Sequence, residues 1–321
     1  SLLKAATGWQ LRGFACDAST TVAQLCKPLR PRVMASLIDP LCVSALNTPA
    51  ERASGQVFLR VLRDSLLGGQ GASNLLLPKV DLGSLFPQTA AHWLLHRGAS
   101  VHTGCRVERL AVVPATAAAS PQWLVNGATF DAVIWATSSS NAATALMEYA
   151  QAAPEMIANA MQAWAATAHN LRFEAITTVY AHAAGARLRQ PMLALHSAPD
   201  TPQHSSPAPA QFVFDRGQLG GPAGLLAFVV SASTGDRDPL QAQVLRQAQD
   251  QLGLALQAVQ TVVEKRATFA CTPGLLRPPQ AIAPSLWACG DYVAGPYPAT
   301  LEGAVRSGQA AGFLADKPRV A

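Results

Sequence analysis

The residues best suited to chemistry lie near the C-terminal end of the chain. Gly290 and Asp291 follow a short apolar run, and Ala299, Thr300 and Leu301 open a stretch of small residues after a Gly/Pro-rich turn. A strand that leads into the start of a helix is where open α/β sheets bind nucleotides. Gly290 allows a pyrophosphate to approach the backbone, and Asp291 can accept a hydrogen bond from a ribityl hydroxyl. The first N–H groups of the helix can face a flavin carbonyl that gains negative charge on reduction.

The stretch that begins at Ala299 is rich in glycine for a helix. Gly303, Gly308 and Gly312 each cost about 1 kcal/mol relative to alanine in a helix interior. Their presence indicates that something approaches this helix closely. The alternative is an ordinary strand–turn–helix unit that closes a sheet and binds nothing.

Other polar groups have a structural interpretation beside the functional one. His92 and His96 have the spacing of a metal pair, but no third ligand is evident, which favours a solvated helix face. Residues 138–140 are three serines after a strand and are either a phosphate contact or a polar loop. Asp215-Arg216 and residues 264–266 are either turn and ion-pair residues or polar groups at a substrate cavity. No Ser–His–Asp or Cys–His arrangement is visible.

Several segments must position these residues. Residues 1–72 are predicted to be mostly helical, with a helix that starts at Thr48-Pro49 and ends at Gly68. A helix is predicted over 86–97, and an amphipathic helix capped by Asp238 follows. We expect two loops, at 115–122 and 197–210.

The strands that would carry the candidate site are predicted as follows. Residues 101–112 form a strand, 123–130 form a hairpin around Asn126-Gly127, and 131–137 form a buried parallel strand. A further strand is predicted over 285–290, and a helix over 299–314.

Composition narrows the class of protein. The chain has 321 residues, half of them hydrophobic and 13% charged, with a net charge of +5 and a pI near 9.0. No cluster of basic and aromatic residues favours nucleic-acid binding, and the weak positive charge suits an acidic cofactor or peripheral contact with the inner face of an anionic membrane. No apolar run reaches transmembrane length. The six cysteines form no C-x-x-C pair and are expected to be buried, reduced thiols of a cytoplasmic protein.

The segment GDYVAGPYPATLEGAVRSGQAAG, at 290–312, resembles the C-terminal FAD motif of the amine oxidase and phytoene desaturase superfamily. Within that superfamily the chain is similar to the hydroxysqualene dehydroxylase family, also described as squalene-associated FAD-dependent desaturases. The matching blocks span nearly the whole chain and are PLCVSALNTPAERASGQVFLRVLRDSL (40–66), LLLPKVDLGSLFP (75–87), QFVFDRG (211–217) and EKRATFACTPGLLRP (264–278).

The resemblance implies an α/β fold with α+β elements. In it, a Rossmann-like FAD-binding domain, at 73–150 and 280–321, is interrupted by a mixed sheet-and-helix substrate domain, at 1–72 and 151–279. It also implies nine cofactor-binding residues. Arg106 and Val107 would pass the adenine, Ala136 and Thr137 would lie near the nucleotide, and the rest of the set would hold the pyrophosphate, ribityl chain and isoalloxazine: Gly290, Asp291, Ala299, Thr300 and Leu301.

Family members begin with a βαβ unit that carries G-x-G-x-x-G, and this chain has no match to it. Residues 68–73, Gly-Gly-Gln-Gly-Ala-Ser, follow a predicted helix and lack the third glycine. The first βαβ unit is therefore expected to be missing, from a fragment that starts at Ser1 or because another chain supplies it.

The resemblance implies reductive dehydroxylation of hydroxysqualene to squalene, in hopanoid synthesis, by an FAD enzyme whose electron donor is unknown. A carotenoid-type desaturase or amine oxidase shares the FAD motif and is the alternative enzyme. A non-catalytic remnant or interaction module is the alternative of another class. No catalytic residue can be named from the sequence.

Overall fold

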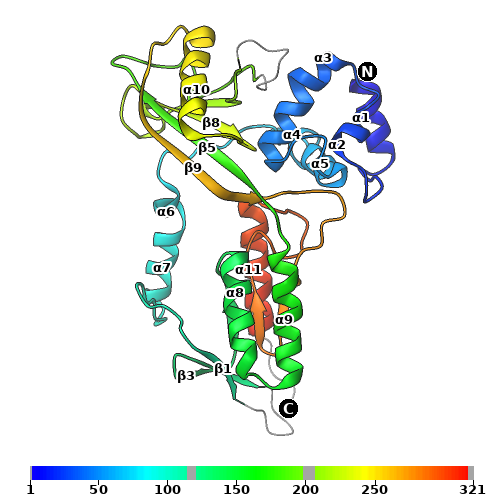
Figure 1. Cartoon of the computed structure of the whole chain (residues 1–321), viewed down its shortest axis with the longest axis vertical. Coiled ribbons are helices and arrows are strands. Elements are labelled where there is room, and N and C mark those ends of the chain that lie inside the picture. The colour runs from blue at the N-terminus through cyan, green and yellow to red at the C-terminus, as the bar shows by residue number, and fades with distance from the viewer. Residues whose placement is uncertain (1, 114–120, 198–206, 317–321) are drawn as a thin grey trace. The chain divides into compact units, whose positions relative to one another are not determined.

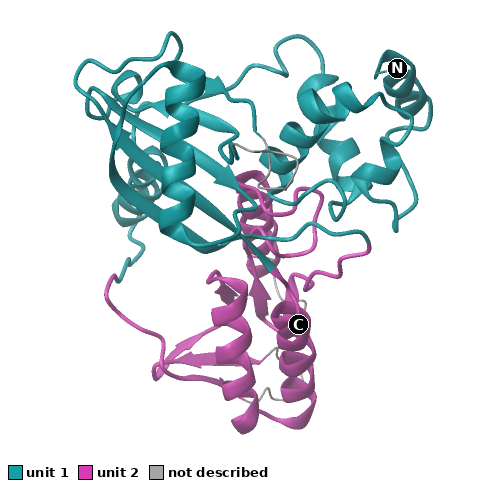
Figure 2. Cartoon of the chain, turned by 45° about the horizontal axis from the view of Figure 1, so that its top comes forward, with its two compact units in different colours: residues 1–102, 173–273 teal, residues 103–172, 274–321 magenta. Residues whose placement is uncertain are grey.

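The structure is a computed structural model that describes residues 2–113, 121–197 and 207–316. The predicted loops at 115–122 and 197–210 lie largely outside the described residues. The chain forms two compact units, each made of two segments: residues 1–102 with 173–273, and residues 103–172 with 274–321 (Figure 2). The predicted domain boundaries followed residues 72, 150 and 279. The assignment of one domain to FAD and the other to substrate stays a prediction.

Residues 2–72 of unit 1 are mostly helical, as predicted, and a helix also forms within the predicted range 86–97. Thr21 caps the second helix in a reciprocal capping box with Gln24, and Ser54 caps the fifth. Two π-helical turns, η1 and η2, interrupt or extend the α-helices. The elements are α1 (Leu2–Leu11), α2 (Val22–Leu25), α3 (Pro31–Val33), η1 (Met34–Ile38), α4 (Asp39–Leu46), α5 (Gly55–Val61), η2 (Leu62–Leu66), α6 (Leu82–Leu85) and α7 (Pro87–His96).

The predicted helix start at Thr48-Pro49 is wrong, because α5 begins at Gly55. Thr48 is fully buried, where its hydroxyl donates to the carbonyl of Leu46 and accepts the N–H of Cys271. These tertiary partners replace the helix N–H groups that a capping threonine would bind. The sequence pattern of a helix cap is local, whereas the hydrogen bond that fixes the Thr48 side chain joins residues 223 positions apart.

Unit 1 also contains a five-stranded antiparallel sheet in the order β6-β7-β8-β5-β9 (Figure 1). Helix α10 (Arg237–Leu252) covers one face, where a continuous apolar core includes Val179, Phe228 and Val244. The predicted cap at Asp238 is wrong, because the helix starts at Arg237 with Asp236 as the N-cap residue. The strands are β5 (Phe173–His182), β6 (Met192–Ala194), β7 (Phe212–Asp215), β8 (Leu225–Ser231) and β9 (Gln257–Phe269), and a 3₁₀ turn, η4 (Gly217–Leu219), follows β7.

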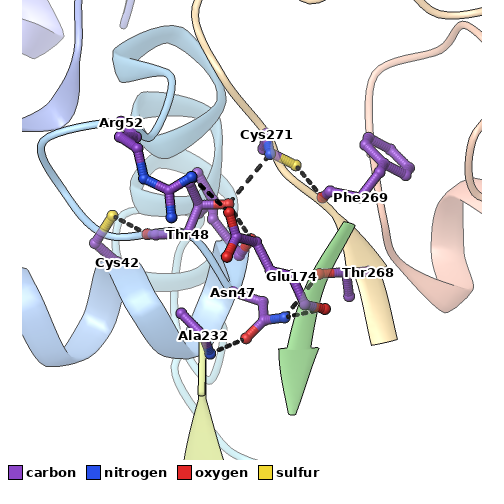
Figure 3. A network of polar contacts seen from close by, with 10 residues as sticks. Cys42, Asn47, Thr48, Arg52, Glu174, Ala232, Thr268, Phe269 and Cys271 are labelled. Carbon is purple, nitrogen blue, oxygen red and sulfur yellow. Dashed lines mark hydrogen bonds and ion pairs between the residues drawn. The ribbon is translucent and has the colours of Figure 1, made fainter. Parts of the chain in front are cut away.

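Asn47 joins the helical part of unit 1 to the sheet (Figure 3). Its side-chain amide donates to the carbonyl of Glu174 on β5 and to the hydroxyl of Thr268 on β9, at 3.3 and 3.0 Å. Its oxygen accepts the N–H of Ala232, just after β8. Asn47 and Ala232 both adopt the left-handed conformation, with φ of +46°. One buried amide therefore holds three strands to the end of α4.

Unit 2 contains two three-stranded sheets. One is an antiparallel meander, β1-β2-β3, whose predicted hairpin at Asn126-Gly127 is confirmed. The other has the order β10-β11-β4, with β11 and β4 parallel. The elements are β1 (Leu110–Val113), β2 (Gln122–Val125), β3 (Ala128–Phe130), β4 (Val133–Trp135), α8 (Ser139–Tyr149), η3 (Ala150–Ala152), α9 (Glu155–His169), β10 (Ala281–Ala283), β11 (Leu286–Ala288) and α11 (Leu301–Ala315).

Two of the predicted strands in unit 2 need correction. Only 110–113 of the predicted strand 101–112 is a strand. In the rest, the side chain of Asn126 takes the place of a partner strand: its oxygen accepts the N–H groups of Glu108 and Arg109, and its nitrogen donates to the carbonyl of Arg106. The strand at 131–137 is parallel as predicted but is not buried, because Ile134 at its centre is 37% exposed.

Candidate cofactor-binding site

The parallel strands β4 and β11 bring two of the predicted site segments together. The N–H of Cys289 donates to the carbonyl of Trp135 at 2.9 Å, which places the ends of the two strands side by side. Ala136 and Thr137 continue from one strand, and Gly290 continues from the other. The carboxyl ends of neighbouring parallel strands are where α/β sheets hold ligands.

The start of α11 is fixed by Thr300, its N-cap residue. The Thr300 hydroxyl accepts the N–H of Gly303 at 3.0 Å and donates to the carbonyl of Tyr297 at 2.9 Å. Ala299 precedes it with a left-handed φ of +56°. In the described part of the chain, the N–H groups of Leu301 and Glu302 have no partner, as expected for the first turn of a helix. These two donors are the ones available to an acceptor on a ligand.

Two glycines of the motif are required by this protein's own atoms. A Cβ on Gly303 would lie 2.0 Å from the carbonyl oxygen of Tyr297, and one on Gly290 would lie 2.6 Å from the ring of Tyr292. Gly290 also has a φ of +155°, which side chains rarely adopt. The close approaches that the sequence attributed to a ligand are therefore made at least in part by Tyr292 and Tyr297.

Ser307 was not singled out from the sequence, yet it joins α11 to the end of β11. Its hydroxyl accepts the N–H of Gly290 at 2.9 Å and lies 3.0 and 2.8 Å from the carbonyl oxygens of Gly290 and Ala304. The backbone of Gly290 is thus held against the helix. The sequence signal was a serine among small residues on the helix face toward the strand, a pattern that also fits simple packing.

Asp291 is partly buried next to the start of α11. Burial raises the pKa of its carboxyl, while backbone N–H groups of Asp291 and Tyr292 and the charge of Arg277 act in the opposite direction. Its carbonyl accepts the N–H of Ala299 at 3.2 Å, so the carboxyl is held close to the turn. Arg277, also missed from the sequence, donates to the carbonyls of Val293 and Gly295 and closes this turn from the other side.

The hydroxyl of Tyr292 is an unusual feature of this site. The side chain is 3% exposed, and its oxygen has no hydrogen-bond partner in the described part of the chain. The ring packs edge-on against Trp164, whose own N–H donates to the carbonyl of Pro279. A buried hydroxyl without a partner costs about 1–3 kcal/mol. A bound group or a water that accepts this hydrogen would remove that cost.

Arg106 and Val107 lie in the irregular segment before β1 and not on the parallel pair. The carbonyl of Arg106 accepts from Asn126, and the carbonyl of Val107 accepts from the hydroxyl of Tyr149 at 3.2 Å. The Tyr149 ring lies 6.1 Å from that of Trp135 on β4. These two residues are therefore linked to the parallel pair through the end of α8.

Several polar residues for which the sequence allowed either a structural or a functional role have the structural one. Asp215 is 2% exposed and accepts the N–H groups of Leu188 and Gln218 and the Gln218 side chain. Burial acts to raise the Asp215 pKa, but these hydrogen bonds lower it below its ordinary value. The buried Asp215 carboxylate, at the end of β7, thus holds the neighbouring chain through hydrogen bonds, which is the structural alternative. His92 and His96 are exposed on α7.

The structure also places the serines and cysteines considered in the sequence. Ser138 is the N-cap residue of α8, and Ser139 is buried. The prediction of buried cysteines is wrong for Cys105, which is exposed, while all six cysteines are free thiols. Cys26, Cys42 and Cys271 are buried, and burial raises the pKa of Cys26 to about 12. No described helix has the length and hydropathy needed to cross a bilayer.

Taken together, the groups of unit 2 fit a flavin nucleotide. A partly buried carboxyl and an unpartnered buried hydroxyl follow the end of β11, and the open start of α11 comes after them. The family model of flavin containing amine oxidoreductases matches residues 21–311. The chain belongs to this family.

The solved structures agree with this fold. An oxidoreductase from Methanosarcina mazei superposes with a TM-score of 0.66 at 14% sequence identity, over 98% of this chain and 71% of that one. At this identity the likeness concerns the fold alone. No curated protein matches the sequence. Membership of the flavin amine oxidoreductase family makes the chain an oxidoreductase, with a mixed α/β fold and a flavin as the implied cofactor.

Proposed function

We propose that this flavin amine oxidoreductase acts with FAD on a long isoprenoid, and that it reductively removes the hydroxyl of hydroxysqualene to give squalene. The sequence blocks at 40–66, 75–87, 211–217 and 264–278 support this choice by their resemblance to hydroxysqualene dehydroxylases. Cytoplasmic location, with peripheral contact at a membrane, is part of the same proposal.

The residues proposed to hold FAD all belong to unit 2. Gly290 and Asp291 would take the pyrophosphate and ribityl chain, and the first turn of α11 after Thr300 would face the ring. Ala136 and Thr137 would lie beside the nucleotide. Arg106 and Val107 would pass the adenine. When bound and reduced, the flavin supplies a hydride.

The observation that carries the substrate class is the face of the unit 1 sheet opposite α10. Strand register places the same-side residues Met192, Phe214, Ala227 and Tyr180 in one row across four strands. A second row of Phe212, Val229, Thr178 and Val262 lies beside it. Most of these side chains are half-buried. Such a face suits a long hydrocarbon, since burial of apolar surface contributes about 25 cal/mol per Å².

The proposed reaction replaces a C–O bond by a C–H bond. The hydroxyl leaves as water after it takes up a proton, and the hydride enters at the same carbon, so that the alcohol gains two electrons and one hydrogen replaces the hydroxyl. The protein's part is to hold the chain, exclude water and donate a hydrogen bond to the leaving oxygen. Tyr180 provides a phenol on the apolar face, and we assign it that donor role.

The test uses a flavin-loaded preparation of the protein, reduced anaerobically and mixed with hydroxysqualene. Squalene should appear, as measured by gas chromatography with mass spectrometry. Tyr180→Phe should slow its formation about 10²–10⁴-fold, the usual contribution of a positioned acid.

Two results would redirect the proposal. Oxidation of phytoene or of an amine by the oxidised enzyme, without squalene formation, would assign a carotenoid-type desaturase or an amine oxidase. Unchanged turnover in Tyr180→Phe would remove Tyr180 from the mechanism and leave the substrate class in place.

A further inference from the structure

Unit 1 contains a cavity of about 500 Å³ that neither the flavin site nor the proposed substrate face uses. It lies where the end of β8 leads into α10, next to the end of α4. All its lining residues belong to unit 1, whereas the nine candidate flavin residues belong to unit 2. Its volume falls within the range of about 300–1,000 Å³ found for small-molecule sites.

The inner wall of the cavity is apolar. Val230 and Leu240 are 4% and 7% exposed, and Pro209 lies beside them. Gln211 also reaches this wall, where its side-chain nitrogen donates to the carbonyl of Pro209 and its oxygen accepts the N–H of Ser231, both at 2.8 Å. The inner wall therefore favours an apolar group.

The mouth of the cavity is polar and carries a negative charge. Among the described lining residues Asp236 is the one ionisable group, and none of them is a lysine, arginine or histidine. Asp236 is the N-cap residue of α10, yet its side chain makes no capping hydrogen bond. In the described part of the chain, the carboxylate of Asp236 and the hydroxyls of Ser231 and Thr234 have no partner. An ionised carboxylate accepts hydrogen bonds and cannot donate them.

The loop that carries these groups is held in place before any ligand arrives. Asn47 accepts the N–H of Ala232, which keeps that residue left-handed. The N–H of Ser233 donates to the carbonyl of Ala175, and its hydroxyl accepts from Thr177, both at 2.9 Å. A preformed loop lowers the entropy cost of binding.

We propose that this cavity binds a small organic cation, with a compact apolar body against the inner wall and a primary ammonium at Asp236. An ammonium offers three hydrogen-bond donors to the acceptors at the mouth, and its charge is opposite to that of Asp236. The N-terminus of α10 carries a partial positive charge that favours an anion, but the full negative charge of Asp236 opposes it, and the described lining residues include no cationic side chain. Because Asp236 is exposed, the charge adds selectivity more than affinity.

The experiment compares three probes with the same five-carbon body: n-pentylammonium, pentan-1-ol and pentanoate. Each is titrated into the full chain, and backbone amide shifts are followed by NMR. We expect shifts at Val230–Gly235 and at the start of α10. Pentylammonium should bind about two- to five-fold more tightly than pentanol, the range given by exposed ion pairs, and pentanoate more weakly than both.

Three variants make the test specific. Asp236→Asn should remove the preference for the amine and leave pentanol binding unchanged. Asp238→Asn is the matched control, since that carboxylate pairs with Arg237 and does not line the cavity. Ala208→Trp should fill the cavity and abolish the binding of all three probes.

The proposal is overturned if pentanoate binds as well as pentylammonium, if Asp236→Asn keeps the amine preference, or if Ala208→Trp binds normally. Absence of any shift with all three probes at millimolar concentration would also overturn it. None of these outcomes depends on FAD or on hydroxysqualene.

Discussion

At the scale of single residues, Gly303 is the most constrained position of the candidate flavin site. Gly303→Ala and Gly303→Leu should both distort the turn between Tyr297 and Thr300, because the added Cβ would lie 2.0 Å from the Tyr297 carbonyl oxygen. The sequence indicates, from the glycines of this helix, only that something approaches it closely. The structure assigns the nearest clash to the turn itself, so we expect loss of stability together with loss of bound flavin.

The measurement is thermal unfolding of the chain combined with the flavin-to-protein absorbance ratio of preparations reconstituted with FAD under the same conditions. Gly308→Ala provides the control, because a Cβ there meets nothing within 4 Å and alanine should stabilise the helix by about 1 kcal/mol. Loss of flavin from Gly303→Ala with unchanged unfolding would instead show that the flavin, and not the turn, excludes a side chain.

Asp39 is a second residue with a testable role. It lies at the junction of η1 and α4, where burial and the nearby charge of Glu51 raise its pKa. One carboxyl oxygen is buried without a partner in the described residues. An acid whose pKa is higher in the folded state holds its proton more tightly there. Its contribution to stability is therefore present below the unfolded pKa of about 3.9 and is lost as pH rises through the folded pKa.

Asp39→Asn should consequently raise the melting temperature at pH 8 and have a smaller effect at pH 4. Calorimetry at both pH values gives the comparison, with the exposed Asp250→Asn as control. An equal change at the two pH values would show that packing, and not charge, determines the effect.

At the scale of elements, the contact between α4 and the sheet depends on Asn47. Asn47→Ala removes three hydrogen bonds and places alanine at a φ of +46°. The free energy of unfolding should fall by on the order of 2–4 kcal/mol, as expected when buried groups on β5, β8 and β9 lose their partner. Urea denaturation measures this loss.

Asn47→Gly separates the two causes, because glycine keeps the left-handed backbone and loses only the side chain. It should recover about 1 kcal/mol relative to alanine. Asn141→Ala, on an exposed face of α8, should have little effect. A loss below 1 kcal/mol in Asn47→Ala would mean that solvent satisfies the freed groups.

Individual helices and strands also show which features could be predicted from the sequence and which could not. The strand predicted over 285–290 and the helix predicted over 299–314 are found at 286–288 and 301–315, because their signals are local: an apolar run, a Gly/Pro-rich turn and a stretch of small residues. The segment at 101–109 was predicted as a strand because its apolar residues suit one. Its backbone is instead bound by Asn126, about twenty residues later, and no local pattern encodes that partner.

Some residues of the candidate site could be recognised from the sequence, and others could not. Gly290, Asp291 and Thr300 stand out by type and spacing. Ser307, Arg277 and Tyr292 become visible only when the fold places them against these residues. Arginine and serine are common surface residues, so their presence in a sequence gives no sign of a buried backbone contact.

At the scale of the whole molecule, this 321-residue chain expressed alone should purify without flavin. The resemblance implies that a G-x-G-x-x-G turn holds the pyrophosphate together with Gly290 and Asp291, and these 321 residues contain no match to that turn. In addition, α11 carries large exposed apolar side chains at Leu301 and Phe313, which are 72% and 74% exposed. Surfaces of this kind promote aggregation. We therefore expect low solubility and a colourless protein.

The visible absorbance spectrum and gel filtration, with and without added FAD, give the answer. A soluble monomer with one FAD per chain would show that the residues of unit 2 are sufficient to hold the nucleotide.

The path of the chain between the two units also affects how the protein is made. Strand β4 ends at Trp135, and its partner β11 begins at Leu286, about 150 residues later. Ribosomes add about 5–20 residues per second, so roughly 8–30 s pass before the partner strand is synthesised. During that time the exposed edge of β4 is available to chaperones or to other nascent chains. Slower translation after Arg172 should therefore increase misassembly, whereas chaperone supply should raise the yield of native protein.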